Sequence, residues 1–352
     1  MGVMIEEVVG MVDVTELLKS LKSVKEVSLS LGEERRVREW LKSGVLAFDW
    51  LVSKGKGFPL GRIVEVCGDY SVGKSLIAYK LLANAQRKGF LAVLFDVEVA
   101  YDREFGSRCG LDNSKLIVLS DLTVEKGWEV MLEVMEKSTV PVVFVWDSIA
   151  ATPTEKESKD GMDVRDLTKA QVVGKGFRLV SQELDKTNSM LVLLNQLREK
   201  IGEPFGGEFA PGGRAIDYHV AVKIELKRRG YIAEDKMVKG LKVRATVTKN
   251  RVDIPFRELT LTLRWDRDDF IPWWEGLLDI LMLEGKVVEA GGWYKFTYED
   301  KKWRAGDFLE MLVAQPHRVL PALESVFGDA VYEYLVDALP VDELDKEEVA
   351  NG

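Results

Sequence analysis

Short apolar runs without polar alternation recur between residues 61 and 195, and helical patterns separate them. Such runs are typical of strands that are buried on both faces, and intervening helices indicate a parallel sheet covered on both sides. The expected strands are Ile63–Cys67, Leu91–Phe95, Leu116–Leu119, Val142–Trp146 and Met190–Leu194. The sequence therefore predicts an α/β fold with a mainly parallel, twisted sheet flanked by helices.

Strict alternation of apolar and polar residues replaces these runs around residues 222–227, 241–247 and 259–265. This period predicts strands with one face in water, as in an antiparallel extension of the sheet. A helical and then an alternating pattern at 13–31 predicts a small arm. We expect four parts: an N-terminal oligomerisation arm over residues 1–36, a core over 37–268, a small α/β domain over 269–338 and a disordered acidic tail over 339–352.

Charge is distributed unevenly along this 352-residue chain of net charge −9. Residues 223–257 hold eleven basic against four acidic side chains, whereas residues 337–349 hold six acids and one lysine. Each block is an ordinary solvated surface or a site for a charged partner. Two cysteines and two histidines imply neither a disulfide framework nor a zinc site. The start of the chain lacks a signal-peptide pattern, so we expect a cytoplasmic location without membrane association.

One motif carries nucleotide chemistry. The pattern G-x-x-x-x-G-K-[ST] is met at every fixed position between a predicted strand and a predicted helix, which makes a chance glycine-rich turn a weak alternative. Its residues are Gly68, Asp69, Tyr70, Ser71, Val72, Gly73, Lys74 and Ser75. Lys74 is expected to contact the β- and γ-phosphates of ATP, and the Ser75 hydroxyl to ligate Mg²⁺.

Polar side chains follow three of the predicted strands. Asp147 is expected to hold Mg²⁺, although it could simply cap the next turn. Glu98 is the preferred carboxylate for activating the attacking water, with Asp96 as its competitor. Gln196 could hydrogen-bond the γ-phosphate or, with its neighbour Asn195, cap the strand end. These positions converge because the carboxyl ends of parallel strands share one edge of the sheet.

Two stretches are too long for ordinary connections. Pro153–Lys169 is dense in charge, and Leu197–Arg214 contains five glycines and two prolines. Structureless loops longer than about 12–15 residues are usually functional or disordered. Both stretches leave the edge of the sheet where ligands bind in such folds.

Several short segments resemble those of the bacterial RecA family, in the same order and with similar spacing. They are Gly61–Val66, Gly68–Ser75, Phe95–Asp102, Asn195–Gly202, Gly212–Ala215, Lys249–Arg251 and Gly291–Tyr294. The resemblance runs from about Leu29 to Tyr294. It implies a RecA-like P-loop ATPase core and a DNA strand-exchange recombinase, which forms filaments on single-stranded DNA, pairs it with homologous duplex DNA and hydrolyses ATP when DNA is bound.

The resemblance also implies a role for each matched residue. Glu98 would be catalytic, and Gln196 would sense the γ-phosphate and couple it to the DNA loop. Lys249 and Arg251 would reach a neighbouring subunit's ATP, and Tyr218 would lie at the subunit interface. Asp102 and Phe105 match positions near the adenine base. The positions expected to contact DNA are Arg178, Lys200, Gly212, Gly213 and Arg214.

Two other functions remain open at this point. A helicase-like ring ATPase would share the P-loop core but would need a ring-forming linker, so the arm and the small domain favour filaments. A nucleotide-bound DNA coat that no longer hydrolyses ATP is the second alternative. The presence of Lys74, Glu98 and Gln196 argues against such a coat.

Overall fold

The computed structural model of the chain describes residues 36–160, 169–199, 208–209 and 213–335. The chain divides into two compact units, residues 1–37 and residues 38–352, and nearly all described residues belong to the second. The predicted arm, apart from its last residue, and the predicted acidic tail lie outside the described residues.

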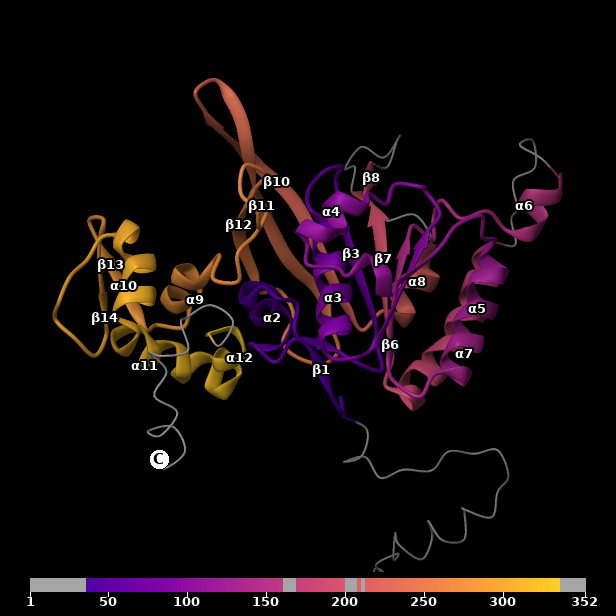
Figure 1. Cartoon of the computed structure of the whole chain (residues 1–352), viewed down its shortest axis with the longest axis horizontal. Coiled ribbons are helices and arrows are strands. Elements are labelled where there is room, and N and C mark those ends of the chain that lie inside the picture. Colours follow the sequence, from indigo (N-terminus) through magenta and orange to yellow (C-terminus); the bar gives the residue numbers. More distant parts are fainter. Residues whose placement is uncertain (1–35, 161–168, 200–207, 210–212, 336–352) are drawn as a thin grey trace, which may run out of the picture. The chain divides into compact units, whose positions relative to one another are not determined.

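An eight-stranded sheet with the order β12-β11-β10-β3-β7-β6-β4-β5 forms the centre of the second unit (Figure 1). The strands from β10 to β5 in this order pair in parallel, and β11 and β12 continue the sheet antiparallel. Their bounds are β3 (Ile63–Gly68), β4 (Leu91–Asp96), β5 (Leu116–Leu119), β6 (Val142–Asp147), β7 (Met190–Gln196), β10 (Val222–Glu234), β11 (Met237–Asn250) and β12 (Glu258–Arg264). The prediction of a mainly parallel sheet with an antiparallel extension is confirmed, although β10, which alternates like β11 and β12, joins the parallel set.

Helices cover both faces of this sheet. Because successive residues of a strand face opposite sides, each central strand packs against the helices on both faces. In β6, Val143 and Val145 belong to one hydrophobic cluster, whereas Phe144 and Trp146 belong to the other. The helices of the core are α2 (Leu46–Ser53), α3 (Lys74–Arg87), α4 (Arg103–Arg108), α5 (Val124–Lys137), α6 (Glu155–Asp160), α7 (Lys169–Thr187) and α8 (Gly213–His219). Burial on two faces explains why these strands read as apolar runs.

A smaller α/β layer follows β12. Its elements are α9 (Leu277–Leu283), the hairpin of β13 (Val287–Ala290) and β14 (Trp293–Phe296), α10 (Phe308–Ala314), α11 (Pro316–Phe327) and α12 (Tyr332–Leu335). Trp303 is buried there, whereas Trp293 is 44% exposed and lies 3.8 Å from the Arg304 guanidinium. Short paired strands complete the structure: β1 (Trp40–Leu41) with β2 (Phe58–Pro59), and β8 (Arg198–Glu199) with β9 (Glu208–Phe209).

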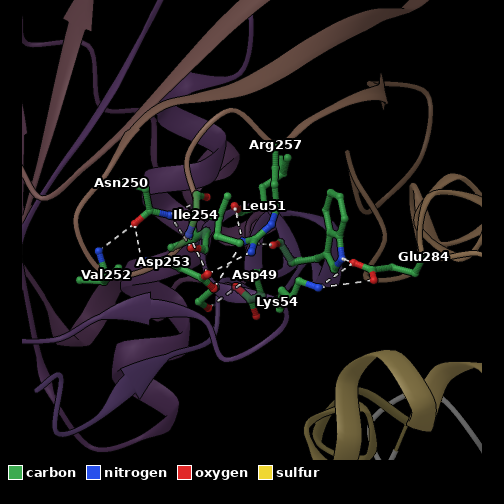
Figure 2. A network of polar contacts seen from close by, with 12 residues as sticks. Asp49, Leu51, Lys54, Asn250, Val252, Asp253, Ile254, Arg257 and Glu284 are labelled. Carbon is green, nitrogen blue, oxygen red and sulfur yellow. Dashed lines mark hydrogen bonds and ion pairs between the residues drawn. The ribbon is translucent and has the colours of Figure 1, made fainter.

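Polar contacts join α2 to the loop between β11 and β12 and to the smaller layer (Figure 2). Arg257 donates to the carbonyls of Trp50 and Leu51, both at 3.4 Å, and Asn250 Nδ2 donates to the Val52 carbonyl at 2.8 Å. Glu284 accepts from Trp50 Nε1 at 2.9 Å. The bonds from Arg257 to Leu51 and from Asn250 to Val52 supply donors to carbonyls that a helix leaves free in its last turn. Across the described ranges, no helix combines the length and apolar character needed to span a bilayer.

Candidate active site

The P-loop connects the end of β3 to the start of α3 and leaves a cradle for an anion. Gly73 precedes the helix with φ of 93°, and a Cβ built there would lie only 2.7 Å from Leu263 Cδ1. No side chain caps the first turn of α3. Backbone N–H groups at such a helix start carry partial positive charge and favour phosphate oxygens.

Lys74 points its ammonium back over the loop. Nζ donates to the Gly68 carbonyl at 3.1 Å and to the Asp69 carbonyl at 2.5 Å. Burial lowers the pKa of Lys74, and the charge of Asp147 is the largest opposing effect. A partly buried cation whose hydrogen-bond partners are neutral carbonyls is suited to an anionic ligand, so this lysine fits a triphosphate.

Asp147 ends β6 beside the P-loop, and the nearby Ser75 hydroxyl acts to lower its pKa. Burial, followed by the nearby charge of Glu98, raises the pKa of Asp147 to about 6. A carboxylate and a hydroxyl side by side suit a hard cation such as Mg²⁺, which keeps several water ligands of its own. The described residues contain no group of three or more acidic, histidine or cysteine side chains that could hold a metal ion by themselves.

The two carboxylates that follow β4 differ in their surroundings. Asp96 is buried and accepts hydrogen bonds from the backbone N–H groups of Ala100 at 2.9 Å and Tyr101 at 3.0 Å. Glu98 is exposed and accepts from Ser148 Oγ at 2.8 Å. Asp96 therefore shapes the turn, and Glu98 is the carboxylate that faces solvent at the sheet edge.

A pocket of about 490 Å³ extends from the P-loop toward α4 and β12. Asp102 caps α4 and accepts from the Phe105 backbone N–H at 2.6 Å. The Phe105 ring packs against Tyr79 and Phe270, with centroids 5.7 Å and 4.9 Å apart. The pocket thus has polar and charged groups at the P-loop and an aromatic wall at the other end.

Eight of the residues that line this pocket are not singled out by the sequence patterns. Four of these have aromatic or charged side chains: Tyr79, Arg264, Trp265 and Phe270. Tyr79 lies in a helical pattern and Trp265 in an alternating one, so both resembled core positions. The one available signal was the concentration of aromatic residues at the end of the last alternating run.

Gln196 lies beside the P-loop strand. It is paired in register with Gly68, and the backbone N–H of Leu197 donates to the Gly68 carbonyl at 3.2 Å. The same carbonyl accepts from Lys74 Nζ. The start of the glycine-rich stretch is therefore bonded directly to the phosphate-binding loop.

The model of the RecA N-terminal domain family matches residues 15–268. The chain belongs to the RecA family. It is 32% identical over 281 residues to "Protein RecA" of Clostridium tetani (strain Massachusetts / E88), an alignment that covers 79% of each chain. The resemblance and the α/β fold class expected from the sequence are thereby confirmed.

Lys249 and Arg251, the basic pair singled out by the RecA resemblance, do not line the P-loop pocket of their own chain. They line a second pocket of about 640 Å³, together with Asp217, Tyr218 and Lys223. Tyr218 is 66% exposed there. Placement away from the chain's own P-loop is what a contribution to a neighbouring subunit requires.

The residues expected to contact DNA are only partly described. Arg178 is exposed on α7. The pKa of His219 is lowered first by the burial of its ring and then by the charges of Arg178, Arg251 and Lys249. Gly213 and Arg214 open α8. Lys200 and Gly212 lie outside the described residues.

Proposed function

We propose that this RecA family member is an ATP-dependent DNA strand-exchange recombinase that assembles into filaments on single-stranded DNA and pairs it with homologous duplex DNA. Family membership and the relative named "Protein RecA" support this function. The observation that carries the mechanism is the in-register pairing of Gly68 with Gln196. It joins the phosphate-binding loop to the residue directly before the stretch Leu197–Arg214, which contains four of the expected DNA contacts: Lys200, Gly212, Gly213 and Arg214.

The residues at the sheet edge fit ATP hydrolysis. Lys74 would hold the β- and γ-phosphates, and Ser75 and Asp147 would hold Mg²⁺. Bound Mg²⁺–ATP supplies the phosphoanhydride bond and the charge neutralisation that its cleavage requires. Glu98 would orient the attacking water and accept its proton. The aromatic wall around Phe105 would hold the base.

Assembly completes the site. Lys249 and Arg251 would stabilise transition-state charge on the ATP of the adjacent subunit, with Tyr218 at the contact. The expected DNA contacts are Arg178, Lys200, Gly212, Gly213 and Arg214, which suit sequence-independent binding to a phosphate backbone. Hydrolysis would then depend both on DNA and on the neighbouring copy.

The test combines ATP hydrolysis, with and without single-stranded DNA, and strand exchange between homologous substrates. The proposal expects DNA-stimulated hydrolysis, filaments by electron microscopy and exchange that requires ATP. A ring ATPase or a passive coat would fail the exchange reaction. Hydrolysis that is equally fast without DNA, by protein that remains in discrete rings, would refute the proposal.

A further inference from the structure

A buried charged side chain lies in the centre of the sheet, outside the phosphate-binding loop. Glu65, in the middle of β3, is 0% exposed and lies in register between Leu193 of β7 and Lys223 of β10. Oε1 accepts from Asn195 Nδ2 at 2.7 Å, and Oε2 lies 3.1 Å from Lys223 Nζ, an ion pair without hydrogen-bond geometry. A buried carboxylate is costly unless such partners are maintained.

Lys223 is shared between two carboxylates. Its Nζ also lies 2.9 Å from Asp217 Oδ1, on α8. Burial acts to lower the pKa of Lys223, but Glu65 and Asp217 outweigh it and raise the pKa. The Asp217 backbone carbonyl accepts a hydrogen bond from Lys249 Nζ. A continuous series of polar contacts therefore runs into the sheet from the second pocket, which Lys249 and Arg251 line and which is called the cationic pocket below.

The other end of this series of polar contacts is Asn195, the residue directly before Gln196. Asn195 is fully buried, and its Oδ1 has no hydrogen-bond partner within the described part of the structure. The orientation of this amide therefore rests on the bond from Nδ2 to Glu65. A change in the Glu65 carboxylate would move Asn195 and, through the backbone, Gln196.

We propose that Glu65 and Lys223 are positioning residues that couple the cationic pocket at Lys249 and Arg251 to Gln196. The inference rests on the proposed function. When Lys249 turns from the Asp217 carbonyl toward a neighbour's phosphate, α8 is released, and Lys223 redistributes between its two carboxylates. Inside the sheet the low dielectric makes that redistribution strong enough to reach Asn195.

The decisive variant is the double substitution Glu65→Gln with Lys223→Met, which removes both charges and leaves no unpaired buried ion. We expect the ratio of DNA-stimulated to DNA-free ATP hydrolysis to fall about tenfold, a size usual for coupling between sites. The KM for ATP should stay unchanged. Lys223→Arg should retain the ratio. Lys227→Met, which breaks the 2.8 Å ion pair to Glu225 on the same strand, is the matched control and should also retain it.

Three outcomes would overturn the inference. The first is a folded double variant, judged by thermal unfolding, with an undiminished ratio. The second is an equal loss of both rates, because that marks a structural role alone. If the double variant does not fold, Asp217→Asn weakens the series of polar contacts at an exposed residue. The third outcome is an unchanged ratio of DNA-stimulated to DNA-free hydrolysis in that variant. A wild-type protein without DNA stimulation would overturn the proposed function itself.

Discussion

At the scale of single residues, burial distinguishes the acidic groups at the edge of the sheet. Asp96 and Glu98 are two positions apart, yet the first is occupied by backbone N–H groups and the second is exposed. Asp147 lies between these extremes, with a raised pKa of about 6 beside Lys74. Carboxyl groups of the same chemistry thus acquire different properties from their surroundings alone.

Glu98→Gln should slow DNA-stimulated ATP hydrolysis by about 10²–10⁴-fold, the usual contribution of a positioned general base. ATP binding should persist, because Lys74 and the P-loop backbone are untouched. Steady-state hydrolysis and nucleotide binding by fluorescence would measure the two effects. Glu129→Gln, on the outer face of α5, is the control. A Glu98→Gln protein as active as wild type would remove this residue from the mechanism.

Asp49 offers a test of pH dependence. It is fully buried on α2 and accepts from the Ser43 N–H and the Tyr334 hydroxyl, and burial outweighs these bonds to raise its pKa to about 6. A raised folded-state pKa gives stability that is present below pH 4 and is lost as the pH rises through 6. The stability of Asp49→Asn relative to wild type should therefore be about 2 kcal/mol greater at pH 7.5 than at pH 4.5.

Urea denaturation at the two pH values would measure that difference. Asp300→Asn, a substitution of an exposed carboxylate paired with Lys295, controls for general charge effects. The same stability difference between wild type and Asp49→Asn at both pH values would contradict the assignment.

At the scale of elements, the α2 C-terminus depends on side chains from far along the chain. Asn250 donates to the Val52 carbonyl and accepts from the backbone N–H groups of Val252 and Asp253 at 3.1 Å and 3.0 Å (Figure 2). One amide therefore shapes the loop after Lys249 and Arg251 and caps α2 as well. The end of β11 and the loop after it, which carry the proposed trans cations Lys249 and Arg251, are thus bonded to their own core.

Asn250→Ala should lower the free energy of unfolding by about 1–3 kcal/mol, because buried backbone groups lose their partners. Chemical denaturation would measure the loss. Gln182→Ala, at an exposed position of α7, serves as a control. An unchanged denaturation midpoint for Asn250→Ala would show that this cap contributes nothing.

Much of the core could be predicted from the sequence because each central strand is buried on both faces. The apolar pattern ends before Asp96, Asp147 and Gln196, whereas in the structure each of these residues is the last of its strand, because backbone pairing does not depend on side-chain polarity. The pairing of Glu65 with Lys223 could not be predicted, since it requires β3 and β10 to be neighbours. The position of Phe270 in the P-loop pocket could not be predicted for another reason, since aromatic residues that line a pocket and those of a core have the same apolar pattern.

At the scale of the whole molecule, the two pockets share no lining residue. If a second copy of the chain completes each ATP site, then the Lys74→Ala and Arg251→Ala proteins should each hydrolyse almost no ATP alone. Mixed with single-stranded DNA, they should recover hydrolysis, because some contacts bring an intact P-loop to an intact arginine. Activity of the mixture no greater than the sum of the two proteins would place Arg251 in its own subunit's chemistry or outside it.

The Gly68 carbonyl accepts from both the P-loop lysine and the backbone of Leu197. A phosphate that draws Lys74 away leaves Leu197 as the remaining donor at that oxygen. Phosphate binding at the P-loop would therefore change the strength of the hydrogen bond from Leu197 to Gly68. In this way, ATP binding would be felt at the residue directly after β7 through one pair of neighbouring strands.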